Sequence, residues 1–374
     1  MLTRWLAEHP PPGPFRRTFW RSPIRGPWLT AMLSIGLLVG FSLVVVTGLL
    51  SYAAYNPGLG PANDPTPDKG LLGFYLFTWP TRPPWLYWLN QGLHVTVGLA
   101  LVPVVLAKLW SVLPKLFEWP PARSVTHALE RLSLLLLVAS TVFELVTGVM
   151  NIQYFYAWPF GFYQAHLYGA WVFIIALVTH VALRARPAIS ALRGRSVMAE
   201  LRTGVRDTVP EPADAGHLVT PNPAPPTMSR RGALGLAGAS SLTVVALSIG
   251  QTLDGPLRST AVLSPRGQSL GVGPNDFPVN KPAALAGVTP ELTGPGWRLE
   301  LRGAITRSLS RDELLAMTQY TADLPIACVE GWSTGVQSWS GVRLIDLARL
   351  VGVDAPGRQL LVESLQRGGG FGSA

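Results

Sequence analysis

The sequence predicts a membrane protein in two parts, a bundle of apolar helices followed by a mixed α+β domain. Hydrophobic residues make up 48% of the 374 residues and charged residues only 14%, which is typical of a chain with membrane spans. Five apolar runs are each about 20 residues long, which is enough to cross a bilayer as a helix. After the fifth run the composition changes to that of a soluble domain with short alternating segments.

The apolar runs define the expected domain organisation. They lie at Leu29–Ala53, Trp85–Leu106, Leu132–Asn151, His166–Leu183 and Gly232–Thr252. Spans one to four are joined by short connections, as in a four-helix bundle. We therefore expect a cytoplasmic Pro/Arg-rich tail at 1–28, a four-helix transmembrane domain at 29–187, a Pro-rich cytoplasmic linker at 188–231, a fifth transmembrane helix at 232–252 and an extracytoplasmic domain at 253–374.

The placement of basic residues predicts the orientation in the membrane. The formal charge of +9 does not indicate a nucleic-acid partner, because the basic residues cluster in alternate connections between spans. They precede span one, lie between spans two and three, and lie between spans four and five, whereas the connection between spans three and four has neither Lys nor Arg. This positive-inside pattern predicts a multi-pass protein in a lipid bilayer, with a cytoplasmic N-terminus and the C-terminal domain outside.

The C-terminal part contains patterns of short strands and helices. Trp297–Arg302 alternates as a strand does, and Ser310–Glu313 is a capping box before the apolar residues 314–317. We also expect strands at Leu324–Val329 and Gln359–Glu363 and a short amphipathic helix at Val342–Leu350. These elements predict an α+β domain.

Three histidines lie in the second and fourth spans. A histidine inside a span is a functional hypothesis by default. His94 and His166 are both near the outer ends of their spans, and we expect them at similar depth on antiparallel helices, as two axial ligands of a haem b. The alternative is a pair of polar side chains bonded across helices. His180 follows His166 by two heptads, which places both within about 40° on one helix face.

Glu144 lies within the third span, where a carboxylate is expensive. Two roles are open for it. It can hydrogen-bond a haem propionate when it is protonated, or it can relay protons.

Cys328 is the only cysteine in the chain. It cannot form an intrachain disulfide, and one cysteine cannot build the usual structural zinc site. No histidine follows His217, so the C-terminal part offers no histidine base to activate a thiol nucleophile. Two interpretations remain: a small buried apolar side chain, or a single thiolate ligand to a soft metal whose other ligands come from a cofactor.

The residues around Cys328 resemble the molybdopterin oxidoreductases of the sulfite oxidase family. Cys328-Val329-Glu330-Gly331-Trp332-Ser333 matches the family's Cys-Val-Glu-x-Trp-Ser run, whose thiolate binds molybdenum. The resemblance extends from about Pro274 and implies Mo-molybdopterin contacts at Asn275, Pro278, Val279 and Ser364. The family's later pterin-binding asparagine, arginine and lysine have no counterpart, so we expect the sulfite oxidase-like domain in this sequence to be incomplete.

The four-span unit resembles the haem-b membrane subunits of the formate dehydrogenase and hydrogenase type. That resemblance implies that His94 pairs with His166. It also implies a partner for His180 in span one, where this sequence has no histidine, so we expect one haem, with His180 as the position of a second.

The pair Arg230-Arg231 precedes the fifth span. By itself it is an ordinary positive flank. Next to a molybdopterin domain it resembles a twin-arginine export signal, because a protein that receives its cofactor in the cytoplasm must cross the membrane folded.

Together these patterns predict a bacterial cell-membrane oxidoreductase that passes electrons between membrane quinone or quinol, haem b and molybdenum. The resemblance is to periplasmic methionine-sulfoxide reductases, and implies reduction of small S- or N-oxides by oxygen-atom transfer. The alternatives are sulfite-type oxidation with reverse electron flow, and a non-catalytic membrane electron carrier or docking protein.

Overall fold

A computed structural model of the chain shows two compact units. It describes residues 9–52, 80, 82–153, 155, 157–160, 162–214, 216–253, 255–263, 277, 283–284, 287–328, 333–354 and 362. The first unit comprises Met1–Leu49 and Gly92–Pro265, and the second Leu50–Gln91 and Arg266–Ala374. The boundary therefore falls within two of the long helices, and each unit is described by itself.

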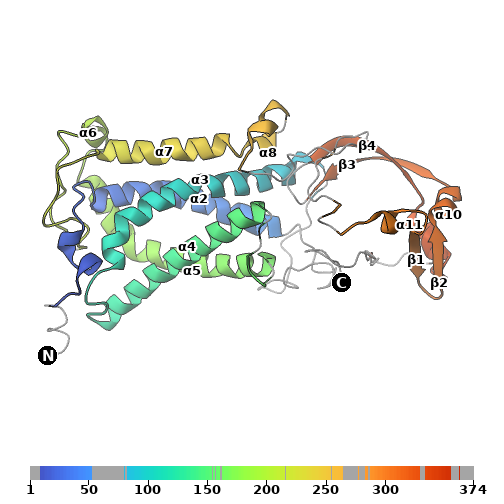
Figure 1. The fold of residues 1–374 in the computed structure, drawn as a ribbon, viewed down its shortest axis with the longest axis horizontal. Coiled ribbons are helices and arrows are strands. Elements are labelled where there is room, and N and C mark those ends of the chain that lie inside the picture. The colour runs from blue at the N-terminus through green and yellow to red at the C-terminus, as the bar shows by residue number, and fades with distance from the viewer. Residues whose placement is uncertain are drawn as a thin grey trace. The chain divides into compact units, whose positions relative to one another are not determined.

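Long apolar helices form the first unit (Figure 1). They are α2 (Pro27–Tyr52), α3 (Trp85–Leu116), α4 (Val125–Ile152) and α5 (Phe162–Arg193), followed by α7 (Arg230–Ala246). Within the described residues, five helices are long and apolar enough to cross a membrane, which is compatible with a membrane protein. Several extend past the predicted spans, because a helix continues into its polar flanks. Pro103, Pro114 and Pro187 lie inside α3 and α5.

Apolar side chains from three helices form the centre of the bundle. Leu37 and Phe41 of α2 pack against Leu101 and Val105 of α3 and Phe173 of α5. The Phe41 and Phe173 rings meet edge to face at 4.9 Å, a favourable aromatic geometry. This cluster fixes α3 and α5 beside α2, and so determines where their histidines lie.

The N-terminal segment is folded onto the bundle and is not simply a tail. Gly13–Phe15 and Arg17–Phe19 are short 3₁₀ helices, η1 and η2. Ile24 and Trp28 are buried in a cluster that includes Leu234 of α7. The segment predicted as a tail at 1–28 therefore contains short helices and buried side chains in the part that the structure describes.

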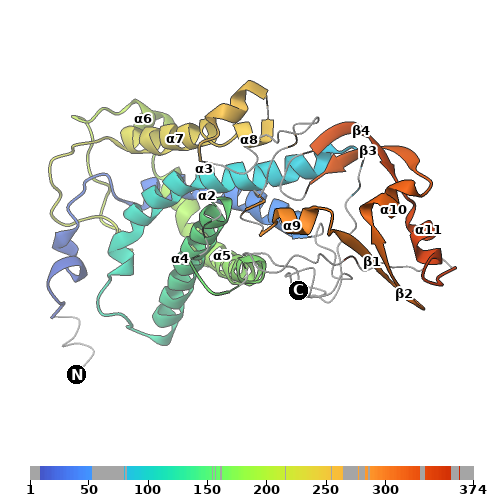
Figure 2. The same ribbon diagram turned by 45° about the vertical axis from the view of Figure 1, so that its right-hand side comes forward.

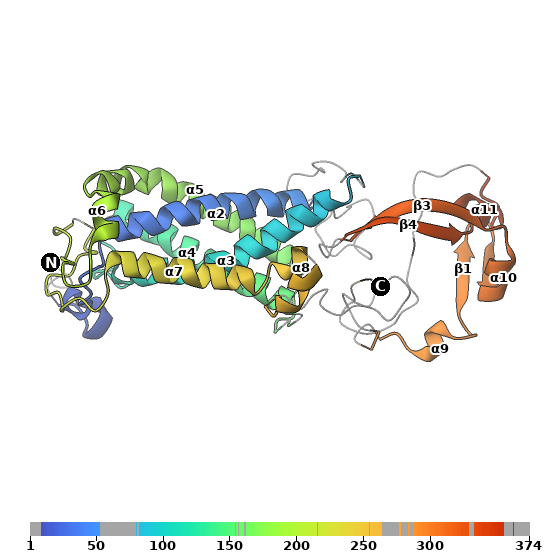
Figure 3. The same cartoon turned by 90° about the horizontal axis from the view of Figure 1, so that it is seen from above.

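The fifth long helix, α7, lies beside α3 in Figure 1 and Figure 3. The hydroxyl of Ser241 in α7 donates a hydrogen bond of 2.7 Å to the carbonyl of Ala100 in α3. The short elements α8 (Gly250–Leu253) and η4 (Gly255–Thr260) follow it in the same unit. The fifth predicted span is therefore packed on the other helices.

The predicted linker is only partly irregular. Helix α5 continues through Pro187 to Arg193, and α6 covers Val197–Arg202. The described residues between 203 and 229, which include the prolines from Pro210 onward, form no helix. The following segment is held against the N-terminal segment. Ala224 donates to the carbonyl of Arg21 at 2.8 Å, and Val219 is buried.

The second unit contains two antiparallel hairpins (Figure 2). Strand β1 (Arg298–Arg302) pairs with β2 (Thr306–Ser310), and β3 (Tyr320–Ala327) pairs with β4 (Ser333–Gly341). Among its described residues this unit also has helices α9 (Pro290–Thr293), α10 (Arg311–Ala316) and α11 (Leu344–Arg349). The structure confirms the first predicted strand, the capping box and the amphipathic helix. Strand β3 begins earlier than expected. Strands β2 and β4 were not predicted. Most of the strand predicted at 359–363 lies outside the described residues.

Candidate functional site

The two outer histidines of the bundle lie side by side. The ring centroids of His94 in α3 and His166 in α5 are 6.4 Å apart, and the ring planes are 80° apart. The helices run in the same direction, not antiparallel as expected, because α3 and α5 are alternate members of an up-and-down series (Figure 1). The two histidines still lie at the same end of the bundle, because each is near the start of its helix.

The bonds of His94 fix which ring nitrogen carries the hydrogen. Its Nδ1 lies 3.1 Å from the carbonyl oxygen of Val44 and 3.2 Å from Oγ1 of Thr47. A carbonyl only accepts, and the Thr47 hydroxyl donates to the Leu43 carbonyl at 2.8 Å. Nδ1 must therefore donate, which leaves the Nε2 lone pair for another partner.

His166 is held in the same way by α4. Its Nδ1 lies 3.0 Å from Oγ1 of Thr147 and 3.0 Å from Oε2 of Glu144. The Thr147 hydroxyl donates to the Phe143 carbonyl at 2.8 Å, so it accepts from the ring. Both rings are thus tied at Nδ1, as metal-binding histidines are when an outer group orients them.

A glycine follows each of these threonines and faces a histidine ring. A Cβ at Gly48 would lie 2.9 Å from Cε1 of His94, closer than carbon atoms normally approach. A Cβ at Gly148 would lie at 3.7 Å from Cε1 of His166, an ordinary contact. A side chain at position 48 would therefore displace the His94 ring, whereas an alanine at position 148 would leave the His166 ring in place.

The residues present fit a metal held from two sides. With metal–imidazole bonds of about 2 Å and about 1 Å more to each ring centre, two rings on one metal ion have centroids about 6 Å apart. In the described part of the chain, no cluster of three or more His, Cys, Asp or Glu side chains is arranged for a metal. Two imidazoles alone therefore suit a metal whose remaining positions are filled by a macrocycle, as in haem.

The sequence contains a repeated signal for these partners. The tripeptide Val46-Thr47-Gly48 recurs as Val146-Thr147-Gly148, once in each helix that precedes a histidine helix. The bundle is in this respect two similar helix pairs, each with a threonine acceptor and a histidine.

Within the described residues, no second histidine lies beside His180. His180 lies within electrostatic range of the Lys108 ammonium. Lys108 donates to the carbonyl of Thr30 at 2.7 Å and to Oγ of Ser34 at 2.6 Å. Lys108 is two heptads after His94, the spacing that also separates His180 from His166.

Cys328 follows directly after β3 and is partly exposed. The register of the β3–β4 hairpin shifts between Pro325 and Ala327, so the chain leaves its regular pairing just before the cysteine. A thiol on irregular backbone at a strand end is accessible to a soft metal centre. The other sequence-predicted pterin residues, Asn275, Pro278, Val279 and Ser364, lie outside the described residues.

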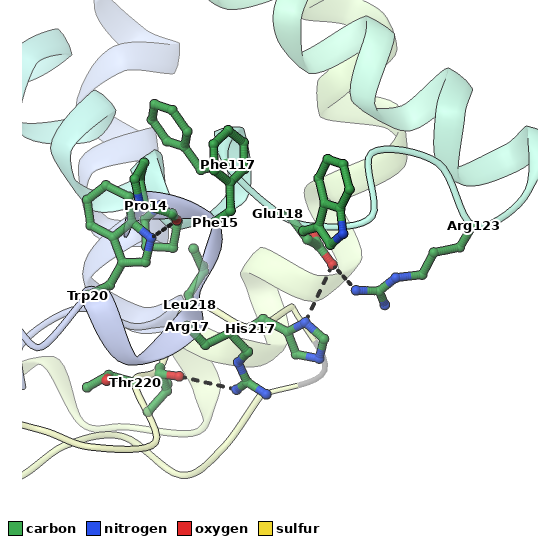
Figure 4. A pocket seen from close by; sticks show the side chains of 13 residues that line it. Pro14, Phe15, Arg17, Trp20, Phe117, Glu118, Arg123, His217, Leu218 and Thr220 are labelled. Carbon is green, nitrogen blue, oxygen red and sulfur yellow. Dashed lines mark hydrogen bonds and ion pairs between the residues drawn. The ribbon is translucent and has the colours of Figure 1, made fainter. Parts of the chain in front are cut away.

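A pocket of about 230 Å³ lies where the N-terminal segment meets the α3–α4 connection (Figure 4). Glu118 accepts from Arg123 at 2.8 Å and lies 3.4 Å from Nδ1 of His217. Arg17 reaches the carbonyl of Val219. These bonds join η2, the α3–α4 connection and the segment before α7. The residues that line the pocket therefore hold these three segments together.

Arg230, the first residue of α7, is buried with 1% of its side chain exposed. It pairs with Glu200 at 3.2 Å and Glu211 at 3.5 Å, and Glu211 accepts from the backbone N–H of Trp28 at the start of α2. Burial raises the pKa of Glu211, and its bond from Trp28 and its proximity to Arg230 oppose this effect. Arg231 has a different environment, with a 3.4 Å contact to the carbonyl of Leu201.

Residues 286–373 match the family described as oxidoreductase molybdopterin binding domain. Searches for similar curated proteins and for similar solved structures found no match. The matched segment indicates a molybdopterin-dependent oxidoreductase of the sulfite oxidase family. It contains Cys328 and Ser364 but begins after Asn275, Pro278 and Val279.

Proposed function

We propose that the protein is a membrane-bound molybdopterin oxidoreductase that exchanges electrons with the quinone pool through one haem b held by His94 and His166. The observation that carries this proposal is the pair of rings at 6.4 Å, each bonded at Nδ1 so that Nε2 is free to bind a metal. A buried haem supplies one-electron transfer between a membrane carrier and a second centre.

The chain's own groups give the bundle its part in this function. Val44, Thr47, Glu144 and Thr147 orient the two imidazoles, and Gly48 leaves space beside one of them. Preorganised ligands of this kind bind a cofactor in one geometry without rearrangement.

Cys328 is the residue that we assign to molybdenum. A thiolate is a soft donor, and the pterin cofactor brings the other sulfur ligands. Bound there, the molybdenum cofactor supplies oxygen-atom transfer, and we propose small S- or N-oxides as the substrates. The protein's contribution is one strong donor at the end of β3.

Metal and haem contents of the purified protein test this proposal directly. We expect about one haem and one molybdenum per chain. Cys328→Ser replaces a soft donor by a hard one and should abolish nearly all turnover per bound molybdenum with an artificial electron donor, while the haem spectrum stays unchanged. Unchanged turnover per molybdenum would make Cys328 a structural residue.

From the distribution of basic residues we further propose that the N-terminus lies in the cytoplasm and the C-terminal domain outside the membrane. A phosphatase fused after residue 374 should be active, and a fluorescent protein that matures only in the cytoplasm should be dark at the same position. The opposite pair of results would place Cys328 in the cytoplasm.

A further inference from the structure

The pocket at the α3–α4 connection has two chemically different walls (Figure 4). One wall is aromatic. The Phe15 ring meets the rings of Phe117 and Trp119 edge to face, at centroid distances of 5.6 and 5.9 Å. The Trp20 ring lies 5.9 Å from that of Phe117, and its indole N–H donates to the carbonyl of Pro14 at 2.8 Å. This wall therefore presents apolar ring surface to the pocket.

The other wall is polar and positively charged. Arg17, Arg123 and His217 line it, and among the described lining residues Glu118 is the only carboxylate. Glu118 lies between Arg123 at 2.8 Å and His217 at 3.4 Å, with 15% of its side chain exposed. Arg17 is exposed, and among the described contacts its guanidinium donates one long bond, of 3.5 Å, to the carbonyl of Val219. The charge of Glu118 is thus taken up by its neighbours, whereas Arg17 keeps donors for an anion.

The pocket lies where two of the long helices meet their connection. Helix α3 ends at Leu116, and α4 begins at Val125. At about 1.5 Å per residue, their 32 and 28 residues reach about 48 and 42 Å, close to the roughly 40–45 Å of a bilayer with its head groups. In a membrane these helix ends therefore lie at the level of the lipid phosphates, where tryptophan side chains are enriched.

We propose that this pocket binds the phosphodiester head group of an anionic phospholipid, and that Arg17 contacts the phosphate oxygens. A guanidinium forms strong charge-assisted bonds with phosphate, and basic pockets between spanning helices recognise anionic lipids. The volume of about 230 Å³ is below the roughly 300–1,000 Å³ of pockets for drug-sized ligands, so it suits a head group without its acyl chains. The aromatic wall packs against the glycerol carbons of the bound lipid.

Equilibrium binding of a radiolabelled phosphatidylglycerol to the delipidated full-length protein in detergent tests the proposal. Phosphatidylcholine is the comparison lipid, because it has the same phosphodiester but no net charge. We expect the wild-type protein to prefer phosphatidylglycerol, and this preference should decrease as the salt concentration rises. Arg17→Gln removes one cation beside the phosphate and should weaken phosphatidylglycerol binding about fivefold, which corresponds to about 1 kcal/mol.

Arg16→Gln is the matched control. Arg16 is the exposed neighbour of Arg17 with the same charge, and it is not among the described residues that line the pocket, so its loss should leave the affinity unchanged. Equal losses in the two variants would overturn the proposal, because surface charge in general would then attract the lipid. Equal wild-type affinity for the two lipids would overturn it as well.

Two further measurements complete the test. Inorganic phosphate should not displace the labelled lipid, and displacement at millimolar phosphate would assign the pocket to the free anion and overturn the lipid assignment. If Arg17→Gln does not fold, the salt dependence of the wild-type protein decides. A preference for phosphatidylglycerol that does not change at high salt would overturn the proposal, because the bond to an exposed arginine is screened by salt.

Discussion

The bundle contains two pairs of residues with the same spacing and different surroundings. His94 and Lys108 are two heptads apart in α3, and His166 and His180 are two heptads apart in α5. At the first level, two histidines lie together and each is tied to the preceding helix. At the second level, a lysine takes the place of one histidine and bonds to Thr30 and Ser34.

The comparison shows that histidine spacing alone does not define a haem site in this bundle. The first level has an acceptor for each Nδ1, and a glycine beside each ring. Among the described contacts, the neighbour of His180 is the amine of Lys108, and no acceptor on a preceding helix bonds to its ring. A ligand histidine needs its outer nitrogen fixed before the inner one can be aimed at a metal.

The largest expected effect is at the first level. His94→Ala or His166→Ala removes one of two axial ligands, and each should abolish nearly all haem binding in the membrane-inserted protein. Pyridine haemochrome absorbance per purified chain measures this loss. Full haem spectra in both variants would mean that the ligands lie elsewhere.

The second largest effect is expected at the start of α7, where Arg230 and Arg231 have different surroundings. Removing Arg230 leaves the buried Glu211 without this cation, whereas Glu200 keeps its ion pair with Arg195. Breaking a buried pair in this way costs about 3–5 kcal/mol. We therefore expect Arg230→Gln to reduce the amount of folded membrane protein strongly, and Arg231→Gln to reduce it little.

The same two variants examine the export signal. A twin-arginine signal requires both residues, so equal losses of outward transport of the C-terminal domain in the two variants would favour the signal over the structural role. Immunoblots of membrane fractions and a C-terminal phosphatase reporter separate folding from transport.

A smaller effect is expected from the glycines. Gly48→Ala puts a methyl group 2.9 Å from Cε1 of His94, so the ring must move, whereas the methyl of Gly148→Ala lies at 3.7 Å from the His166 ring. We expect a several-fold loss of haem affinity in the first variant and no loss in the second. Haem titration of the protein purified without haem gives both values, and equal losses would show that the two sides are equivalent.

The sequence predicted much of the fold and only part of the site. Long apolar runs and the Ser310–Glu313 capping box are local features, and they are confirmed in the structure. The rings of His94 and His166 lie close together, but on helices that run in the same direction. The partners of the histidines were not predicted, because they depend on which face α2 and α4 present to their neighbours. The burial of Arg230 was likewise not predicted, because its acidic partners come from a segment that composition alone identified as a linker.

The smallest expected effect concerns His180 and tests the second level of the comparison. If the absence of an oriented histidine partner prevents a haem there, His180→Ala should keep the wild-type haem content, midpoint potential and spectrum. Lys108→Met is the companion variant, because it removes the ammonium that neighbours His180 and bonds to α2. It should also retain the haem, although loss of its two bonds should lower the thermal stability of the detergent-solubilised protein. Two haems per wild-type chain, with one lost in His180→Ala, would contradict this expectation. They would show that His180 binds a second haem iron and that the opposite ligand is a residue other than histidine. Lys108 would then be the first residue to examine, because it occupies the equivalent position on that helix.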